Sequence, residues 1–408
     1  MGSASGADYG FSVPFRFPVY FTRAAWEPGN PLVADVIRRQ EPDRRHRVLV
    51  VLDDHVARTQ VGLSSAIRRY CEAHKNSLEL VSSPMLVPGG EVCKNDLAHP
   101  FKLLELFNDV GLDRQSCVIV VGGGAVLDMV SFAAAIAHRG IRILRLPTTV
   151  LAQADSGIAV KNSVNLFGKK NFIGTFVPPF GVINDVAALT TLPLRDKIAG
   201  VSEAVKVALL KDPGFFGDLE VNSARLASGD VDVLSFVVRR SAELHLAHIC
   251  GNGDPFELGS ARPLDFGHWA AHKLESMTAH RVRHGEAVAI GMALDLTYAV
   301  AKGILDRQTC ARVLRLLATI GLPLWDNALL ERTPDGELAV IRGLREFREH
   351  LGGQLHITMI RGIGRSFEVT EMDEVLVSNA IATLAQGSVQ PSVQTLSRVS
   401  FGAAGGAA

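Results

Sequence analysis

The segment at residues 116–140, SCVIVVGGGAVLDMVSFAAAIAHRG, restricts the possible folds of this chain more than any other. Apolar residues 118–121 predict a buried strand, the three glycines that follow predict a turn, and a helix is expected to begin near Val126. Glycines let backbone amides approach a phosphate at the positive helix N-terminus, so the turn is a candidate nucleotide site; a tight structural turn is the alternative. Asp128 is expected in the first helical turn, where it suits the helix dipole.

Other short apolar runs in the N-terminal half predict further strands. HRVLVVLDD carries Asp53, which could hold the ribose hydroxyls of a dinucleotide or cap the next helix. IRILRLP leads into two threonines in a turn, and GVINDV closes the strand-rich half. FSVPFRFPVYFT predicts an early strand pair at a sheet edge, given Pro14 and Pro18.

Two polar segments of this half carry lysines among glycines and asparagines. Residues 87–95, VPGGEVCKN, which include Glu91 and Lys94, are expected to form a Gly-rich turn. The segment VKNSVNLFGKKNFIG is expected to be a loop and is a candidate anion site because Lys161, Lys170 and Asn171 lie in it. A solvated surface loop is the alternative.

From about Pro193 the apolar period changes to that of long helices, so we expect a first domain at 1–190, a second at 191–390 and a flexible tail at 391–408. Glu203 and Lys206 are three residues apart on one helix face. The apolar residues around them indicate partial burial, and a surface ion pair is the alternative.

The second half holds four histidines within residues 254–291. His268 and His272 share one helix face and can reach one site. His284 opens HGEAVAIGMALDLTYAV, whose apolar residues nearly surround a helix and indicate burial; His280 precedes it. A catalytic metal site needs about three protein ligands and one open position. Buried, hydrogen-bonded histidines or helix caps are the alternative, because the pattern is not HExxH.

Charge and cysteine content narrow the class of protein. Lys plus Arg and Asp plus Glu both number 42, which gives no indication of a nucleic-acid partner. No apolar run approaches the length of a membrane span, and the first residues lack the pattern of a signal peptide. Five cysteines without a CxxC pair indicate reduced thiols and a cytoplasmic protein.

Strand–GGGxxxD–helix, RG, PTT, AxxDS, GKKN, SEAVK, FGHxxxH and HGEAVAIG follow one another in this chain. This order resembles the sugar phosphate cyclases, and 3-dehydroquinate synthase in particular, over roughly residues 45–370, with the non-shikimate relatives of the valiolone-type cyclases most similar. The resemblance implies an α/β fold, with a Rossmann-like NAD-binding domain, an all-α metal-binding domain, an active site in the cleft and a homodimer. It implies a lyase that eliminates phosphate from a sugar phosphate while closing a carbocycle, with NAD recycled and zinc or cobalt as Lewis acid.

The resemblance also implies roles for individual residues. The metal ligands would be Glu203, His268 and His284. The candidate catalytic residues would be His272, Lys161, Lys206 and Asp155. NAD would be held by Asp53, Glu91, Lys94, Gly123, Gly124, Asp128, Thr148, Thr149 and Thr191. Further substrate contacts would fall on Lys170 and Asn171, with Arg139 reaching across the dimer.

The substrate pocket departs from the synthase pattern at several positions. DSSVGGKT is replaced by DSGIAVKN, which introduces Ala159 and Val160. LNFGHT is replaced by LDFGHW, so the carboxylate of Asp265 stands for an amide, and Arg262 is shifted by one residue from the family arginine.

Two lysines of the synthase pattern are also missing. His350 stands about where one is expected, and the helix that would carry the other has His245 and His248 nearby. These changes remove positive charge or add negative charge where the family holds a carboxylate. We therefore expect a neutral seven-carbon ketose phosphate, such as sedoheptulose 7-phosphate, as substrate. A 3-dehydroquinate synthase, a metal-dependent polyol dehydrogenase and a catalytically silent homologue are the alternatives.

Overall fold

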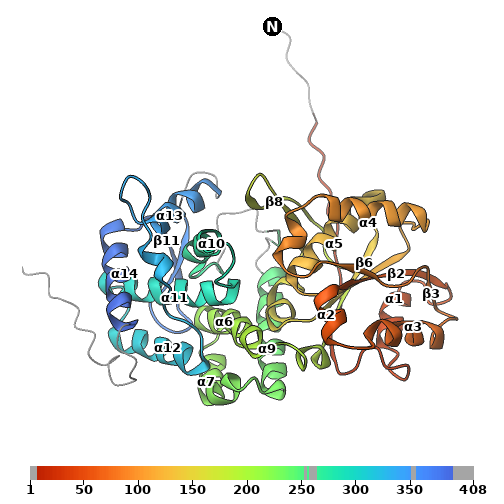
Figure 1. Ribbon diagram of the computed structural model, residues 1–408, viewed down its shortest axis with the longest axis horizontal. Helices are drawn as coiled ribbons and strands as arrows, with labels where there is room; N and C mark the ends of the chain where they lie inside the picture. The colour runs from red at the N-terminus through yellow and green to blue at the C-terminus, as the bar shows by residue number, and fades with distance from the viewer. Residues whose placement is uncertain (1–6, 252–254, 257–263, 351–354, 389–408) are drawn as a thin grey trace, which may run out of the picture.

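The computed structural model describes residues 7–251, 255–256, 264–350 and 355–388. Figure 1 shows a sheet-based part built from the N-terminal half and a helical part built from the C-terminal half, with α6 and α9 between them. None of the helices in the described ranges is both long and apolar enough to cross a membrane.

The sheet-based part is a parallel α/β sheet. Its strand order is β1-β9-β6-β5-β2-β3, and β4 also pairs with β2. The strands are β1 (Val19–Thr22), β2 (His46–Asp53), β3 (Leu78–Leu80), β4 (Met85–Val87), β5 (Cys117–Gly122), β6 (Arg142–Pro147) and β9 (Gly181–Asp185). Every paired neighbour is parallel, which is the expected outcome for near-continuous apolar strands.

Alternate side chains of the central strands bury themselves on opposite faces of this sheet. Leu49 and Val118 pack into one core with residues of α4 (Ala98–Asp109) and α5 (Gly124–Ile136). Val48 and Ile119 pack on the other face with residues of α1 (Leu32–Arg38) and α3 (Leu63–Ala73). Figure 1 shows these two helix pairs on either side of the sheet, and α2 (Asp54–Thr59) follows β2 directly. The predicted Rossmann-like domain is confirmed.

Two local predictions for this part are wrong. Residues 11–18 form no strand, so the expected N-terminal strand pair is one strand, β1, at the sheet edge; Pro14 and Pro18 have no N–H to donate to a ladder. The expected polar loop is a hairpin of β7 (Lys161–Leu166) and β8 (Lys169–Phe176). Its two-residue turn has Phe167 and Gly168 at φ 54° and 69°, as in type I′ hairpins.

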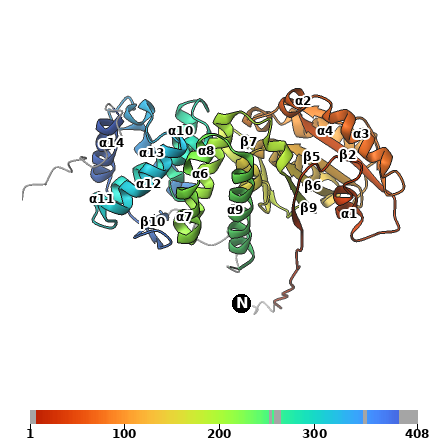
Figure 2. The same cartoon turned by 90° about the horizontal axis from the view of Figure 1, so that it is seen from below.

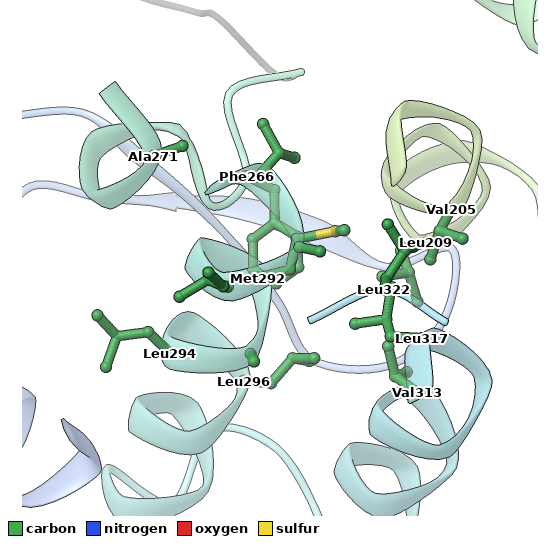
Figure 3. Packing of buried hydrophobic residues seen from close by; sticks show 14 of the residues in the cluster. Val205, Leu209, Phe266, Ala271, Met292, Leu294, Leu296, Val313, Leu317 and Leu322 are labelled. Atoms are coloured by element: carbon green, nitrogen blue, oxygen red, sulfur yellow. The ribbon is translucent and has the colours of Figure 1, made fainter. Parts of the chain in front are cut away.

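The C-terminal part is organised around α11 (His284–Ala301), which is buried from Gly285 to Ala299 except at Glu286. Figure 3 shows apolar side chains of α6, α11 and α12 converging around Phe266. The helices are α6 (Leu194–Lys211), α7 (Pro213–Val221), α8 (Ser223–Ala227), α9 (Val231–Gly251), α10 (His268–Met277), α12 (Arg307–Ile320), α13 (Ala339–His350) and α14 (Glu374–Ser388). The domain expected to be all-α is helical, and it also contains the hairpin of β10 (Ile357–Ile360) and β11 (Ser366–Val369).

The two parts meet where α6 and α9 pack against the segment after β6. A Cβ on Gly200 of α6 would lie 2.6 Å from Cβ of Val150, so glycine permits the close approach. Ala242 of α9 packs with Ile158 and Val182 of the sheet-based part. Figure 2 shows α9 standing beside the sheet, between the two parts. Side chains from α6, α9 and the segment after β6 are thereby brought to one place.

Candidate active site

Three side chains from three helices converge in the helical part. Glu203 lies on α6, His268 begins α10 and His284 begins α11, and their ligand atoms all lie within 4.8 Å of one another. Nε2 of His268 and Nε2 of His284 are each 3.6 Å from Oε1 of Glu203. The predicted grouping of a carboxylate with two imidazoles is therefore present in the fold.

Close backbone contacts hold these three helices in register. A Cβ on Gly291 of α11 would lie 2.0 Å from the carbonyl oxygen of Gly267, the residue before α10, and Gly267 itself has φ +78°. A Cβ on Gly285 of α11 would lie 1.9 Å from the carbonyl oxygen of Ala199 on α6. Only glycine fits these contacts, and each lies within a few residues of one of the three converging side chains.

The chemistry of this group fits a divalent metal ion. Oε1 of Glu203 is buried and has no hydrogen-bond partner among the described residues. The second ring nitrogens face acceptors, with Nδ1 of His268 3.2 Å from the Phe266 carbonyl oxygen and Nδ1 of His284 3.0 Å from Oε2 of Glu275. Such outer contacts orient metal-bound histidines and raise their basicity. Two imidazoles and one carboxylate match a catalytic zinc-type ligand set with a position left for substrate.

Burial and charge set the protonation of the group. Burial, helped by the charge of Lys206, holds the pKa of His268 well below its usual value, so this ring is neutral, as a ligand must be. Burial would lower the pKa of His284 too, but the carboxylates of Glu275 and Glu203 outweigh it and raise the pKa to about 9. A cation between Glu203 and His284 would compete with this proton.

The other two predicted histidines lie outside the triad. The ring of His272 is 5.5 Å from that of His268 and 6.2 Å from that of His284, centroid to centroid, and its side chain is exposed. His280 is half exposed, with Nδ1 4.0 Å from Glu275. His272 therefore lies beside the candidate metal ligands, whereas His280 lies near Glu275, a neighbour of those ligands.

Next to the triad lies a buried set of alternating charges. Nζ of Lys206 forms an ion pair with Oε2 of Glu203, and both side chains are buried. Burial would lower the pKa of Lys206, but Glu203, Asp155 and Asp265 act in the opposite direction and raise it, so the ammonium is retained. Nδ1 of His245 lies 2.8 Å from Oδ1 of Asp155. The predicted residues Asp155 and Asp265 thus both act electrostatically on Lys206.

Lys170 connects the β7–β8 hairpin to this site. Its Nζ is 3.0 Å from Oε1 of Glu275, whose other oxygen faces His284. Glu275 is buried on α10, and its pKa is held low because His284 and Lys170 outweigh the effect of burial. Sequence reasoning missed Glu275 because HKLESM reads as an ordinary amphipathic helix.

Arg145 is a second residue that sequence reasoning missed. It is fully buried in β6, and its guanidinium donates to the carbonyl oxygens of Gly157 at 3.3 Å, Ala159 at 2.7 Å and Lys161 at 3.4 Å. One side chain thus shapes the segment between Asp155 and Lys161. An arginine inside an apolar strand was the available signal.

Several of the predicted nucleotide-binding residues, among them Asp53, Gly123 and Thr148, gather at the carboxyl edge of the sheet. A Cβ on Gly122 would lie 3.1 Å from Cβ of Asp53, and the N–H of Thr148 donates to the Gly122 carbonyl oxygen at 3.0 Å. The hydroxyl of Thr148 is buried without a partner among the described residues. Asp53 caps α2 by accepting from the His55 N–H, so the capping interpretation of this acid is confirmed and the ribose contact stays a prediction. Such an edge, with an unpaired hydroxyl beside glycines, fits a dinucleotide.

The glycine turn begins its helix earlier than predicted. Gly123 is the N-cap and Gly124 the first residue of α5, two residues before Val126, so Asp128 lies beyond the first turn. A Cβ on Gly124 would lie 2.6 Å from Oγ of Ser156, which explains a glycine there. The hydroxyl of Thr149 accepts from the Ala152 N–H at 3.1 Å and so orders the next turn.

A polar cluster joins this edge to the hairpin. Buried Lys94 is 2.7 Å from Oδ2 of Asp128 and also donates to Asn171. Glu91 accepts from Nδ2 of Asn165 at 2.8 Å, and Asn165 in turn accepts from the Asn171 N–H. The structure therefore brings Glu91, Lys94, Asp128 and Asn171 together.

The remaining predicted residues are exposed or lie outside the described residues. Thr191 is exposed and accepts from Gln60 at 3.3 Å, Lys161 is exposed at the start of β7, and Arg139 is exposed with φ 64°. Arg262 and the side chain of His350, at the end of α13, lie outside the described residues.

Comparisons with known proteins extend over both parts of the fold. Two family models, described as 3-dehydroquinate synthase N-terminal and C-terminal, match residues 84–199 and 200–336. A 2-epi-5-epi-valiolone synthase of Streptomyces glaucescens is 35% identical over 362 residues, 88% of each chain. A 3-dehydroquinate synthase of Paracoccus denitrificans is 37% identical over 305 residues, 74% of this chain and 82% of the relative.

One solved structure provides the same comparison in three dimensions. It is 2-epi-5-epi-valiolone synthase from Streptomyces hygroscopicus with NAD+ and Zn2+ bound, and it matches with a TM-score of 0.82 at 26% identity over 93% of this chain and 100% of that one. The resemblance inferred from the ordered motifs is confirmed by these matches. The chain belongs to the 3-dehydroquinate synthase family.

Proposed function

We propose that the protein is an NAD- and divalent-metal-dependent sugar phosphate cyclase that converts a seven-carbon ketose phosphate to a carbocycle and releases phosphate. The observation that carries this proposal is the buried group of Glu203, His268 and His284, in which a carboxylate oxygen has no hydrogen-bond partner among the described residues. The 35% identity to a 2-epi-5-epi-valiolone synthase over most of both chains supports it.

Each cofactor would supply one kind of chemistry. A divalent cation, zinc or cobalt, held by Glu203, His268 and His284 would act as a Lewis acid on a substrate hydroxyl. NAD, held at the sheet edge by residues such as Asp53 and Thr148, would accept a hydride and return it, so that the net reaction involves no redox change.

The chain's own residues would bind and orient the sugar phosphate. Lys170 and Asn171 on the hairpin, with Lys206 on α6, offer positive charge and donors for the phosphate group. Lys206 keeps its ammonium because Glu203 and Asp155 surround it, and it would orient substrate oxygens near the triad. His272, exposed beside the triad, is the candidate for moving a proton at the substrate.

The preference for a ketose phosphate over an acid-bearing sugar follows from charge. Asp265 adds a carboxylate close enough to Lys206 to affect its pKa, and His245 is engaged with Asp155. A substrate carboxylate would meet this negative charge, and a like-charge pair at about 4 Å costs on the order of 4 kcal/mol at an effective dielectric of 20.

3-Dehydroquinate synthase activity is the second candidate function, because a 3-dehydroquinate synthase is 37% identical to this chain.

The test is phosphate release from sedoheptulose 7-phosphate and from 3-deoxy-arabino-heptulosonate 7-phosphate, with kcat/KM measured for each. Higher kcat/KM for sedoheptulose 7-phosphate supports the proposal; at least a tenfold preference for the heptulosonate, about 1.4 kcal/mol, would assign 3-dehydroquinate synthase instead. Steady NADH formation with simple polyols would indicate a dehydrogenase. Failure of the purified protein to bind either metal or NAD would exclude all three enzymes.

A further inference from the structure

Asp295 is a fully buried carboxylate in the middle of α11, and its two oxygens contact the residues on either side of His268. Oδ2 accepts from the backbone N–H of Gly267 at 2.9 Å. Oδ1 accepts from the indole N–H of Trp269 at 2.8 Å. One side chain of α11 therefore grips the start of α10 at two points.

The burial of Asp295 lowers the stability of the fold relative to an apolar residue of similar size, because a carboxylate opposite neutral donors loses its hydration. Trp269 is itself almost fully buried, and its indole N–H requires an acceptor. Asp295 and Trp269 therefore satisfy each other's hydrogen-bonding groups, and their bond fixes the first turn of α10 against α11. Figure 3 shows how Phe266, just before that turn, is enclosed by apolar side chains of the same core.

The helix that carries Asp295 also carries a candidate ligand. His284 begins α11, and Asp295 lies about three turns further along it. Between them, Gly291 touches the Gly267 carbonyl oxygen so closely that no Cβ would fit. The backbone contact prevents α10 from moving toward α11, and the hydrogen bonds to Asp295 prevent it from moving away.

We propose that Asp295 is a positioning residue for the metal site, which holds the ring of His268 at the correct place relative to His284 by fixing Gly267 and Trp269. The inference rests on the proposed function only in taking Glu203, His268 and His284 as metal ligands. Asp295 itself touches neither metal nor substrate. Asp295 acts by holding His268 of the apoprotein in the position that metal binding requires.

Two variants separate this role from general stabilisation. Asp295→Asn keeps the size of the side chain but can accept only one of the two hydrogen bonds. Trp269→Phe removes the indole donor and leaves Asp295 and the Gly267 contact in place, so it provides a milder test should the first variant fold poorly. The matched control is Thr297→Val. Thr297 is also buried on α11, and within the described part of the chain its hydroxyl donates to a residue of the same helix, to the Ala293 carbonyl oxygen at 2.8 Å.

The measurements are the affinity of the apoprotein for Zn2+ by chelator competition, the visible absorption spectrum of the Co2+ form, and the melting temperature of the apoprotein. We expect Asp295→Asn to weaken Zn2+ binding about tenfold or more and to alter the Co2+ spectrum. Trp269→Phe should change both in the same direction by less, and Thr297→Val should change neither.

Unchanged Zn2+ affinity and an unchanged Co2+ spectrum in folded Asp295→Asn, or in Trp269→Phe if the former does not fold, would overturn the inference. An equal loss of Zn2+ affinity in Thr297→Val would also overturn it. The loss would then result from any change to a buried residue of α11, and not from the bonds of Asp295 to Gly267 and Trp269. Wild-type protein that takes up neither metal would instead refute the proposed function, and the inference with it.

Discussion

His245 and Asp155 join the two parts of the molecule directly, with Nδ1 of the histidine 2.8 Å from Oδ1 of the acid. His245 lies on α9, and Asp155 lies in the short π-helix η3 (Ala152–Ser156) that follows β6. Burial would raise the pKa of Asp155, but the charge and hydrogen bond of His245 outweigh it and lower the pKa to about 2. Asp155 is therefore held ionised by a residue of the other part of the molecule.

Acid stability should depend on this pair. The folded pKa of Asp155 lies below the unfolded value, so its contribution is present above about pH 4 and is lost as pH falls to about 2. We predict that His245→Gln raises the Asp155 pKa and costs up to about 2 kcal/mol near pH 5. The check is the acid-unfolding midpoint by circular dichroism, which should rise in the variant. In an Asp155→Asn background His245→Gln should no longer shift it; a shift of equal size there would contradict the prediction.

Removing one candidate ligand should abolish metal binding without unfolding the protein. We predict that His284→Ala lowers metal content to background and eliminates phosphate release, because one carboxylate and one imidazole do not complete the site. Metal analysis and circular dichroism on the same sample provide the measurement. His280→Ala is the control, since that ring is half exposed and lies outside the triad. Full metal occupancy in His284→Ala would show that the ligands are wrongly assigned.

Glu275 should act on metal and phosphate sites together. Its two oxygens face His284 and Lys170, so Glu275→Gln weakens the orientation of the first and leaves the second less well paired. We predict a loss of metal affinity of about 10–100-fold together with a changed KM for the sugar phosphate. Titration of the apoprotein and steady-state kinetics measure the two effects. The control is Glu346→Gln. Glu346 is the exposed partner of Lys273, which lies on α10 with Glu275, so this variant should change neither the metal affinity nor the KM. Equal effects of both variants would contradict the prediction.

Substrate preference should respond to the charge of Asp265. Replacing it by asparagine removes the negative charge that a substrate carboxylate would meet, so Asp265→Asn should raise the kcat/KM ratio of heptulosonate to sedoheptulose phosphate about tenfold or more. Both substrates are measured at one ionic strength. Asp232→Asn removes an exposed charge of the same sign and should leave the ratio unchanged. No change in the ratio for Asp265→Asn would remove charge as the basis of selectivity.

The glycine turn and the histidine helices could be predicted because each depends on a local pattern. β5 and α5 follow from an apolar run and three glycines, and burial of α11 follows from its apolar surface. The β7–β8 hairpin was missed because β7 is polar yet buried: Oδ1 of Asn162 accepts from Thr175, Ser163 accepts from Lys94, and Asn165 donates to Glu91. A strand whose polar residues form hydrogen bonds inside the fold has the same composition as a surface loop, so its sequence does not reveal it.

The contacts behind the triad could not be predicted for a different reason. Glu275, Asp295 and Arg145 act on residues that lie far away in sequence or across a turn, so no spacing rule marks them. Each is a charged residue within a helix or strand, a weak signal that many surface residues share. Only the folded arrangement of α6, α10, α11 and β6 distinguishes them.

The backbone contacts of Gly285 with Ala199 and of Gly291 with Gly267 leave no side chain between the helices that could be exchanged for a larger or smaller one. Stepwise replacement of side chains therefore cannot adjust the distance between the helices at these two crossings. Positions such as Asp265 and His245, in contrast, carry side chains that can be replaced. Substitutions at Asp265 and His245 can therefore change the charges around Lys206 and Asp155, while the crossings that place Glu203, His268 and His284 stay the same. Libraries intended to change substrate choice should accordingly vary positions such as Asp265 and His245 and leave both crossings untouched.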